Sequence, residues 1–572
     1  MAKTRKSAMF INRHYIKLLI SIATTSLLVL IFITVQAIQN TPIPQNTLLK
    51  LQQELETTIH AKNQVISDVT IVKCRSFKFC QIPPGYVTVN PSMTFYKYAK
   101  SDSKKKKLYE YEYYLAVKLL SLDEATRIIS GLSLEQHDGY EVVKVNDKED
   151  NHFFKLYKKF IINNTEHPLP KDTPVLRSID VLFGSNDLID SRKFHQTLHL
   201  STEESVHPIL SISMMSINQY EEYQKQISQE AKSVVKQDQI LETSQNKYKV
   251  MQLSDLHFGQ DLGRCSTGTA DVKCSSDLKT LKFIESTIQQ EHPDLIVITG
   301  DLIDVERSLD YKSILLKSLQ PILASNTKFI YTFGDEIQDK EEKSTIIEFL
   351  SSLPNCLNTF VPFAETNLHG VTNDNLQIFN KITKDKNHVD EQSVSITVLD
   401  SQEHFIDETQ VNYLYRINND FTSTDYKLLF FHYPIPQYRP VGTFKIIGSY
   451  NEKHPLETKT DVKFHDDIIN CRYQVLSVGH EHENDACILS ELTKKPKTNP
   501  RTQKGDGTTP SIWLCYNSIT GDSGITAINE QYVRKIRLFE VDFEKKRILS
   551  WKRKENDKDV LEPQLIYEKK IE

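Results

Sequence analysis

The feature that most constrains this chain is a short apolar stretch that ends in a carboxylate and an imidazole. Residues 249–259 read Lys-Val-Met-Gln-Leu-Ser-Asp-Leu-His-Phe-Gly, which puts Asp255 and His257 one residue apart. Such a run predicts a buried β-strand that delivers both side chains to its carboxyl edge. Taken alone, the pair also fits an ordinary strand end with an exposed Asp and a packed His, so other parts of the chain are needed to distinguish the two.

Length and composition indicate a globular protein of more than one domain. At 572 residues the chain is too long for a single core, which predicts two domains and a terminal segment. Charged residues make up 25% and hydrophobic residues 39%, and the net charge of -5 gives no general attraction to nucleic acid. Function must therefore be sought in motifs.

The N-terminus predicts a membrane anchor. Basic residues in a tail at 1–17 precede an uncharged apolar run at 18–35, long enough to span a hydrocarbon core of ~30 Å. We expect a cytosolic tail, a transmembrane signal-anchor and a stalk at 36–64, with the remaining chain lumenal or extracellular in the endomembrane system or vacuole. A cleaved signal peptide is the alternative, with a tolerable cleavage site at 35–37, although its apolar core would be longer than the usual ~7–15 residues.

Eight cysteines all follow the apolar run, which is compatible with disulfides in an oxidising compartment. We expect Cys265 to pair with Cys274 first, and Cys74 with Cys80 second, because each pair is close in sequence. One glycosylation sequon, Asn163-Asn164-Thr165, is usable only if this topology is right.

The region before the opening motif has two parts. Short strand-like runs and turn signals at 65–216 predict a small β-rich accessory domain. We expect its basic run Lys104–Lys107 to be a solvated loop, with a membrane or phosphate contact as the alternative. The segment 217–246 is rich in Gln, Glu, Lys and Ser, which predicts a polar helical linker.

From 247 to 568 the pattern predicts an α/β domain, because apolar strand-like runs alternate with amphipathic helices. Helices are expected at 276–290, 313–324 and 340–353. Strands are expected at 249–254, 295–299, 328–332, 393–399, 427–431, 473–478 and 511–516, with a closing hairpin at 535–543 and 547–552. An exposed loop is expected at 494–509.

Five of these strands end in potential metal ligands. In chain order the residues are Asp255 and His257, Asp301, Asp335 with Glu336, His432, and His480 with His482. The carboxyl ends of strands share one edge of an open α/β sheet, so these side chains could converge there. Such convergence would be electrostatically costly unless cations are bound.

The ligand types predict two metal ions and phosphoester hydrolysis. Mixed carboxylate and imidazole ligation suits Mn, Fe or Zn, and the absence of thiolates near the strand ends argues against a structural zinc site. A bridging carboxylate would hold two ions ~3.5–4 Å apart, where they could clamp a phosphoryl group and activate a hydroxide for in-line attack.

The order of these motifs resembles that of the calcineurin-like metallophosphoesterases over residues 248–567. Motifs at 369–371, 430–436 and 513–516, and one at 181–187, are similar to the branch of the fungal dosage-dependent cell-cycle regulator phosphatase and plant purple-acid-phosphatase-like proteins. The resemblance implies a four-layer α/β/β/α sandwich that hydrolyses phosphomonoesters, with phosphoproteins as substrates. A phosphodiesterase remains an alternative, whereas a nuclease would need a basic groove that no cluster near the strand ends supplies.

The resemblance also implies a role for each ligand. Asp255, His257 and His482 would hold one divalent or trivalent ion. Asp301 would bridge the two ions. His432 and His480 would hold the second ion, with Asp335 as a further oxygen ligand. We expect His369 and Asn373 to lie in surface loops, although both could line the pocket.

Glu336 is the departure from the family pattern that matters most. The family motif Gly-Asn-His reads Gly334-Asp335-Glu336 here, and the family's His contacts phosphoryl oxygens and assists the leaving group. An ionised Glu at this catalytic position would repel a phosphate dianion. Two hypotheses follow: a phosphatase with an altered or slower acid step, or a catalytically weak metal-binding homologue that acts through protein interaction. The sequence does not predict an oligomeric state.

Overall fold

The computed structural model describes residues 63–569, apart from 76–79, 95–110, 146–154, 165, 167, 201–205, 234–237, 261, 267–273, 306–307, 309, 360–366, 386–387, 493–509, 524–527 and 530. Every element described below belongs to one compact unit, Glu56–Glu572. The expected anchor at 18–35, the basic run Lys104–Lys107 and the loop at 494–509 lie outside the described residues. None of the helices in the described part of the chain is long and apolar enough to cross a membrane.

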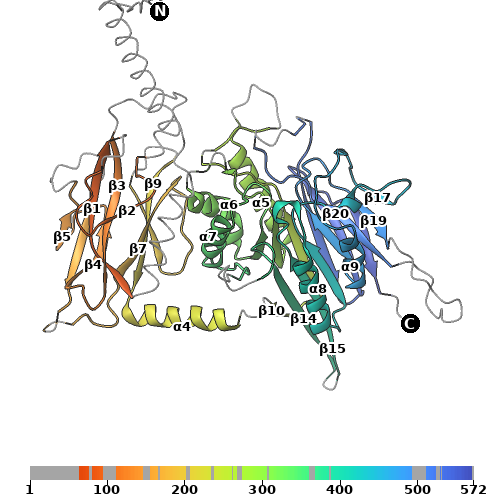
Figure 1. The fold of residues 1–572 in the computed structure, drawn as a ribbon, viewed down its shortest axis with the longest axis horizontal. Coiled ribbons are helices and arrows are strands. Elements are labelled where there is room, and N and C mark those ends of the chain that lie inside the picture. Colours follow the sequence, from red (N-terminus) through yellow and green to blue (C-terminus); the bar gives the residue numbers. More distant parts are fainter. Residues whose placement is uncertain are drawn as a thin grey trace, which may run out of the picture. The chain divides into compact units, whose positions relative to one another are not determined.

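The accessory region is built from strands, as expected, and consists of three small antiparallel sheets (Figure 1). Their strands, in spatial order, are β1 (Gln64–Arg75), β3 (Tyr111–Ser121) and β2 (Val87–Val89); β4 (Arg127–Ser133), β6 (Tyr157–Ile162) and β5 (Tyr140–Val142); and β7 (Val175–Gly184), β9 (His207–Met215) and β8 (His195–His199). The three sheets share one apolar core, to which they contribute Val69 and Leu115, Ile129, and Ile179 respectively. Alternate apolar side chains along each strand supply this core.

The sequon at Asn163 is not a free surface site. The side-chain amide of Asn163 donates hydrogen bonds to the backbone oxygens of Leu122 at 3.0 Å and Ala125 at 2.9 Å. A glycan would replace one of the two N–H groups that make these bonds, so both bonds could not be kept, and the sequon gives no support to a lumenal location.

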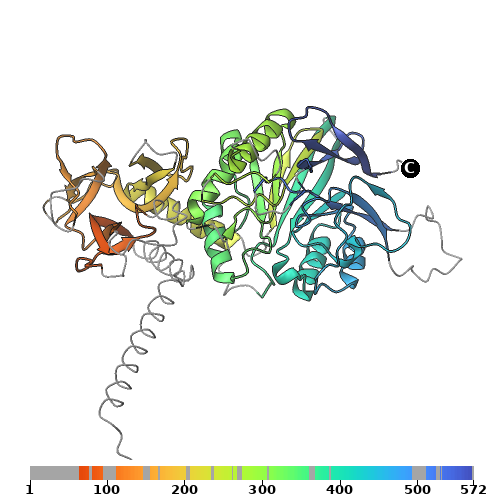
Figure 2. The same ribbon diagram turned by 90° about the horizontal axis from the view of Figure 1, so that it is seen from above.

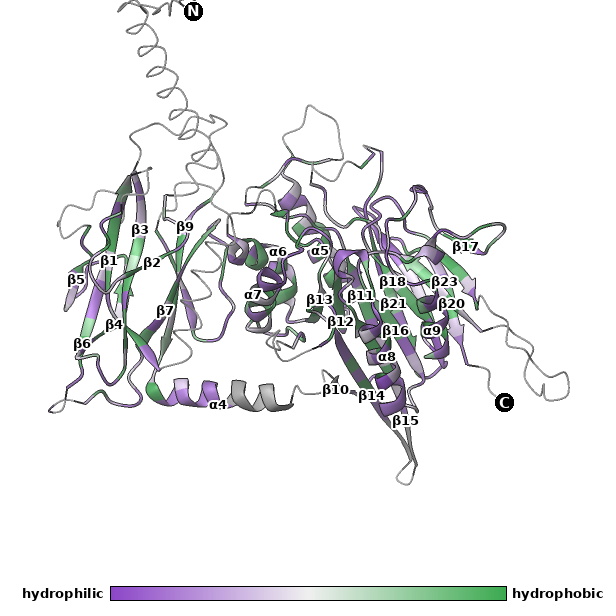
Figure 3. Cartoon of the chain, in the orientation of Figure 1, coloured by the Kyte–Doolittle hydropathy of each residue, from purple (hydrophilic) through white to green (hydrophobic). Residues whose placement is uncertain are grey.

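The segment predicted to be a helical linker is only partly helical. The part of helix α4 (Ile217–Ser233) that Figure 3 colours is mostly polar after its first residues, but β10 (Asp238–Thr243) is a strand that pairs in parallel with β14 (Asp374–Asp385). The linker prediction was wrong for β10 because an edge strand needs few apolar side chains, and Ile240 is 64% exposed.

The second half of the chain contains two large mixed sheets. A six-stranded sheet has the order β13 (Lys328–Thr332), β12 (Leu295–Thr299), β11 (Lys247–Leu253), β21 (Lys535–Asp542), β22 (Arg547–Lys554) and β23 (Leu561–Glu568). An eight-stranded sheet has the order β10, β14, β15 (His388–Val398), β16 (Tyr426–Phe430), β18 (Val475–Val478), β20 (Ser511–Tyr516), β19 (Cys487–Glu491) and β17 (Ile446–Ile447).

Helices cover the outer faces of these two sheets (Figure 2). Helices α5 (Ser276–Glu291), α6 (Tyr311–Ser325) and α7 (Lys340–Ser351) pack on the six-stranded sheet, and α8 (Glu408–Asp420) and α9 (Lys463–Asn470) pack on the eight-stranded sheet. A further core lies between the sheets. In β11, Val250 faces this inner core and Met251 faces the helices, so the strand is buried on both sides.

The parallel strands fix where the site can form. β11, β12 and β13 are parallel neighbours in the first sheet, and β15, β16, β18 and β20 are parallel neighbours in the second. Their carboxyl ends therefore meet at one edge of the two-sheet stack, where side chains that follow the strands are brought together.

Three disulfides are present among the described residues. The expected pairs Cys74–Cys80 and Cys265–Cys274 are both confirmed. The third, Cys487–Cys515, joins opposite residues of β19 and β20 and was not predicted, because its pairing depends on strand register.

A buried charge network joins the accessory region to α6. Arg192 contacts Asp190 and Asp180, each with a shortest distance of 2.6 Å, and Lys312 of α6 contacts Asp180 at 2.9 Å. Burial alone would raise the pKa of Asp190, but Arg192 lowers it overall. The backbone N–H of Phe183 also donates to the Ser313 hydroxyl at 2.8 Å.

Removing the central cation of this network should destabilise the protein strongly. Arg192→Ala is expected to lower the free energy of unfolding by about 3–5 kcal/mol, because the buried Asp190 carboxylate loses its ion-pair partner and Asp180 keeps only Lys312. The matched control is Arg127→Ala, whose partner Glu141 is 54% exposed, with an expected loss below about 1 kcal/mol. Urea denaturation followed by circular dichroism measures the free energy of unfolding of both variants. Equal losses in the two variants would contradict the stabilising role of the buried network.

Candidate metal centre

The predicted ligands follow directly after the parallel strands, in unusual backbone conformations. Asp255, His257, Asp301 and His480 have φ angles of 54°, 47°, 45° and 69°. Left-handed backbone at a residue other than glycine costs on the order of 1–3 kcal/mol and is concentrated at functional sites. Hydrogen bonds hold these turns, including one from the N–H of His257 to the oxygen of Asp301 at 2.9 Å.

The structure brings six of the seven predicted ligands together in two groups of three. Asp255, His257 and His482 form one group, and Asp335, His432 and His480 form the other; within each group the potential ligand atoms lie within 4.8 Å of one another.

Asp301 is within reach of both groups. It forms one such cluster with Asp255 and His432, and another with His257 and Glu336. This is the arrangement that a bridging carboxylate requires.

Two buried ring nitrogens show that the residues fit metal ions. Nε2 of His257 and Nε2 of His432 are buried and make no hydrogen bond. Nδ1 of His432 lies 2.9 Å from the backbone oxygen of Thr299, which fixes the proton on Nδ1 and leaves the lone pair of Nε2 facing the cluster.

The spacing of the side chains also suits shared ions. His432 Nε2 lies 3.4 Å from Asp301 Oδ2 and 3.5 Å from Asp335 Oδ1, which is long for hydrogen bonds. Two atoms that each bind one ion at about 2.0–2.2 Å are themselves about 3.0–3.5 Å apart. The donor set and its spacing therefore fit two metal ions.

Glycines allow the strand ends to approach this closely. A Cβ at Gly334 would lie 1.9 Å from Asp301 Oδ1, and one at Gly479 would lie 1.9 Å from Ser254 Oγ. These contacts explain why glycine precedes both Asp335 and His480.

The carboxylates create a field that favours cations. Burial alone would lower the pKa of His432, but Asp301, Asp335 and Asp255 raise it well above its ordinary value. Burial would likewise lower the pKa of His257, but Glu336 and nearby aspartates raise it to about 9. The same field would stabilise metal ions.

Glu336 has a partner that the sequence did not predict. Its Oε1 lies 2.5 Å from Nδ1 of His257, and its Oε2 accepts a hydrogen bond from the backbone N–H of Val305 at 2.9 Å. Both neighbours donate, so Glu336 acts as an acceptor that orients His257 and leaves His257 Nε2 for a metal.

The structure adds two residues to the site that the sequence analysis missed. Nε2 of His404 lies 3.3 Å from Asp335 Oδ2, although no strand-end motif includes His404. Arg439 holds Glu481, the residue between His480 and His482, through contacts of 2.6 and 2.7 Å. No sequence signal marked either residue, because both lie in irregular segments.

His369 and Asn373 do not join the cluster. Asn373 is buried, so its expected place in a surface loop was wrong; its side chain accepts hydrogen bonds from Asp400 N and Gln410 Nε2. His369 is half-buried, and its Nε2 lies 3.3 Å from the backbone oxygen of Gln402.

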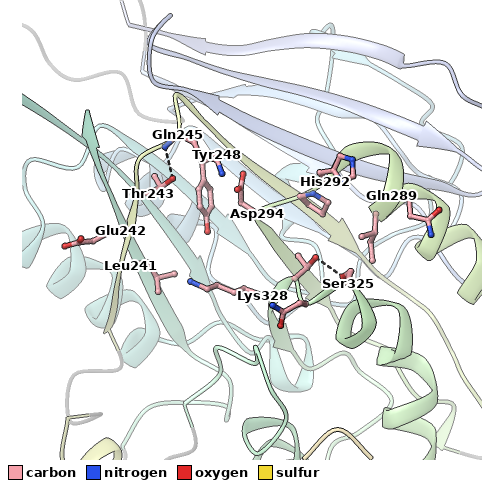
Figure 4. Close-up of a pocket in the computed structure, with 14 residues that line it drawn as sticks. Leu241, Glu242, Thr243, Gln245, Tyr248, Gln289, His292, Asp294, Ser325 and Lys328 are labelled. Carbon is pink, nitrogen blue, oxygen red and sulfur yellow. Dashed lines mark hydrogen bonds between the residues drawn. The ribbon is translucent and has the colours of Figure 1, made fainter. Parts of the chain in front are cut away.

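A cavity of about 540 Å³ lies at the opposite ends of the strands (Figure 4). Tyr248 near the start of β11, Asp294 before β12 and Lys328 at the start of β13 line it. It is thus separated from the metal ligands by the length of these strands.

Comparisons with known proteins agree with this geometry. Residues 248–484 match the family model of calcineurin-like phosphoesterases, which confirms the resemblance predicted from the motifs. The chain is 31% identical over 316 residues to Protein SIA1 of Kluyveromyces lactis, covering 54% of this chain and 49% of that protein. It is 29% identical over 341 residues to Phosphatase DCR2 of Saccharomyces cerevisiae, covering 54% of each. The chain thus spans about half the length of these two relatives.

A plant relative carries a different name. Probable inactive purple acid phosphatase 14 of Arabidopsis thaliana is 24% identical over 370 residues, covering 56% of this chain and 84% of that protein. The similar proteins therefore include one named as a phosphatase and one named as inactive.

Removing the Glu336 side chain should weaken metal binding. Glu336→Ala is expected to lower metal affinity by about 10–100-fold, because His257 loses the group that orients it. Glu336→Gln keeps an acceptor oxygen and should lose less. Competition with a fluorescent chelator measures the affinity, and Glu285→Ala on the exposed face of α5 is the control. Unchanged affinity in Glu336→Ala would contradict the orienting role.

Proposed function

We propose that residues 248–484, which make up a calcineurin-like phosphoesterase domain, hydrolyse phosphomonoesters with two metal ions. The observation that carries this proposal is the pair of three-residue ligand groups joined by Asp301. Mn, Fe and Zn suit the mixed oxygen and nitrogen donors. Bound ions would supply Lewis-acid chemistry, polarising a phosphoryl group and lowering the pKa of an attacking water.

The chain's own residues would prepare the site for this chemistry. Asp255 is fixed by the Ser254 hydroxyl and by the N–H of His480, 3.2 Å from its Oδ2. Glu336 and the oxygen of Thr299 set the ring orientations of His257 and His432. Such preorganisation lets ligands keep their geometry while charge develops on the substrate.

The charge balance predicts a slow enzyme. Two divalent ions would leave a single net positive charge after neutralising Asp255, Asp301 and Asp335, and ionised Glu336 would cancel it. A phosphate dianion would then be attracted less strongly than in a site with His at this position.

We propose phosphoproteins as the substrates, in line with the resemblance to a fungal phosphatase branch. Nucleic acid is not proposed as a partner, because the chain has a net charge of -5 and the nearby Arg439 is paired with Glu481. The location proposed from the sequence is a single-pass anchor at 18–35 with the catalytic domain in the lumen or outside the cell, in the endomembrane system or vacuole.

One observation favours a second function. Glu336 stands at the position of the usual His and accepts hydrogen bonds rather than donating them. A metal-binding protein with little turnover, acting through protein interaction, would need only the ligands.

A phosphatase assay distinguishes the two functions. We expect the full chain, purified in detergent and supplied with manganese, to hydrolyse para-nitrophenyl phosphate and phosphopeptides slowly. Asp255→Asn should abolish turnover, because it removes a metal ligand. Glu336→His restores the His of the family motif but removes the acceptor for His257.

The outcomes separate the alternatives clearly. Turnover in the wild-type chain that Asp255→Asn abolishes would exclude the interaction-only function. An inactive wild-type chain that gains activity in Glu336→His would exclude the active-enzyme proposal.

A further inference from the structure

We infer that His404 donates a hydrogen bond to the phosphoryl group of the substrate, in place of the His that the family motif has at position 336. The inference rests on the proposed function of the site. It concerns a residue of the 3-10 turn Gln402–His404, which lies outside every strand-end motif.

The first step is that Glu336 cannot fill this role. Its two carboxylate oxygens are directed at His257 Nδ1 and at the N–H of Val305. A carboxylate that accepts from both neighbours has no proton to offer a phosphoryl oxygen, and its charge opposes that of the substrate.

The second step is that the exposure of the described ligands identifies an open side of the cluster. Asp255 and His432 are fully buried, and the Asp301 side chain is 6% exposed, so these residues form the floor. Asp335, His480 and His482 are 22–24% exposed and form the open side.

His404 lies on this open side. Its side chain is 29% exposed, its Nε2 is 3.3 Å from Asp335 Oδ2, and its ring centroid is 6.0 Å from that of His480. The imidazole therefore borders the part of the cluster that a phosphate ester would reach.

The third step is that the ring of His404 is held in place. It stacks on Tyr433 with centroids 3.7 Å apart and planes 12° apart, and its Nδ1 lies 3.1 Å from the backbone oxygen of Glu457. Both contacts are with oxygens that can only accept, and the one at Nε2 is long at 3.3 Å, so an N–H at Nε2 can be shared between Asp335 and a phosphoryl oxygen.

The backbone of the turn supports the same position. Glu403 and His404 have φ angles of 57° and 58°, and the backbone oxygen of His404 accepts from Thr458 Oγ1 at 2.9 Å and Lys459 N at 3.1 Å. Two consecutive residues in left-handed conformation are strained, and such strain persists where the surroundings fix it.

The nearby Arg439 does not compete for this role. Its guanidinium is paired with Glu481 through two contacts and also donates to the Tyr516 hydroxyl at 2.6 Å. His404 also contacts acceptors through both ring nitrogens, but its Nε2 contact with Asp335 Oδ2, at 3.3 Å, is longer than these contacts of Arg439 and can be shared with a substrate oxygen.

Binding of inorganic phosphate to the manganese-loaded full chain tests the inference without requiring turnover. Calorimetry is expected to show phosphate affinity about 10–100-fold weaker in His404→Ala, because a hydrogen bond to a charged group is lost. His404→Gln keeps an N–H donor and should recover part of the affinity. Both variants should still hold two manganese ions per chain by elemental analysis.

His369→Ala is the matched control. His369 contacts the same turn through Gln402 O and packs on Phe405, but it does not reach the ligands. If the turn mattered only as structure, His369→Ala would weaken phosphate binding as much as His404→Ala, and the inference would be overturned. It would also be overturned if His404→Ala lost manganese or bound phosphate with wild-type affinity.

Parallel kinetics with para-nitrophenyl phosphate separate this inference from the proposed function. A wild-type chain that binds phosphate through His404 but shows no turnover would retain the inference and overturn the function. If His404→Ala hydrolysed the substrate with the kcat/KM of the wild-type chain, the proposed function would be retained and the inference would be overturned. A manganese-loaded wild-type chain that neither binds phosphate nor shows turnover would overturn both.

Discussion

Mutual repulsion among three aspartates at one sheet edge is the constraint on which this site depends. Asp255 and Asp301 are almost fully buried and Asp335 is mostly so, and their ligand groups meet within a few ångströms. Four histidines face them, and the pKa of His432 rises well above its ordinary value as a result. Carboxylates in this arrangement are stable only when cations share the space, which is why a metal-binding function explains both the strained turns and the close packing around them.

The two-sheet architecture serves this convergence. Asp255 and His480 are 225 residues apart in sequence, yet the N–H of His480 contacts the Asp255 carboxylate, because β11 and β18 end at the same edge of the stacked sheets. Glycines at 334 and 479 remove the side chains that would otherwise separate the strand ends. The positioning groups, Glu336 for His257 and Thr299 for His432, then determine which ring nitrogens face the centre.

The sequence predicted the parts of this structure that depend on local pattern. The bounds of β12 and β13 match the expected strands, since strands buried on both faces are continuously apolar. Strand β14 was missed because polar residues alternate along it, and α8 was missed although Asp407 and Gln410 form a capping box before its apolar positions. The metal ligands could be predicted from the sequence because they directly follow apolar strands. His404 was not, because it lies 69 residues from Asp335 and only the folded chain brings the two together.

Metal content is the most direct test of the account. Elemental analysis of the purified chain after dialysis against manganese should give two ions per wild-type chain and a clear loss in Asp301→Asn, since Asp301 lies within reach of both groups. Asp294→Asn is the matched control, because Asp294 precedes the same strand that Asp301 follows and its carboxylate accepts from Lys249 N at 2.7 Å. Two ions in wild type and in Asp294→Asn, with fewer in Asp301→Asn, is the predicted result. A wild-type chain without bound metal, or an Asp301→Asn variant that keeps two ions at wild-type affinity, would contradict it.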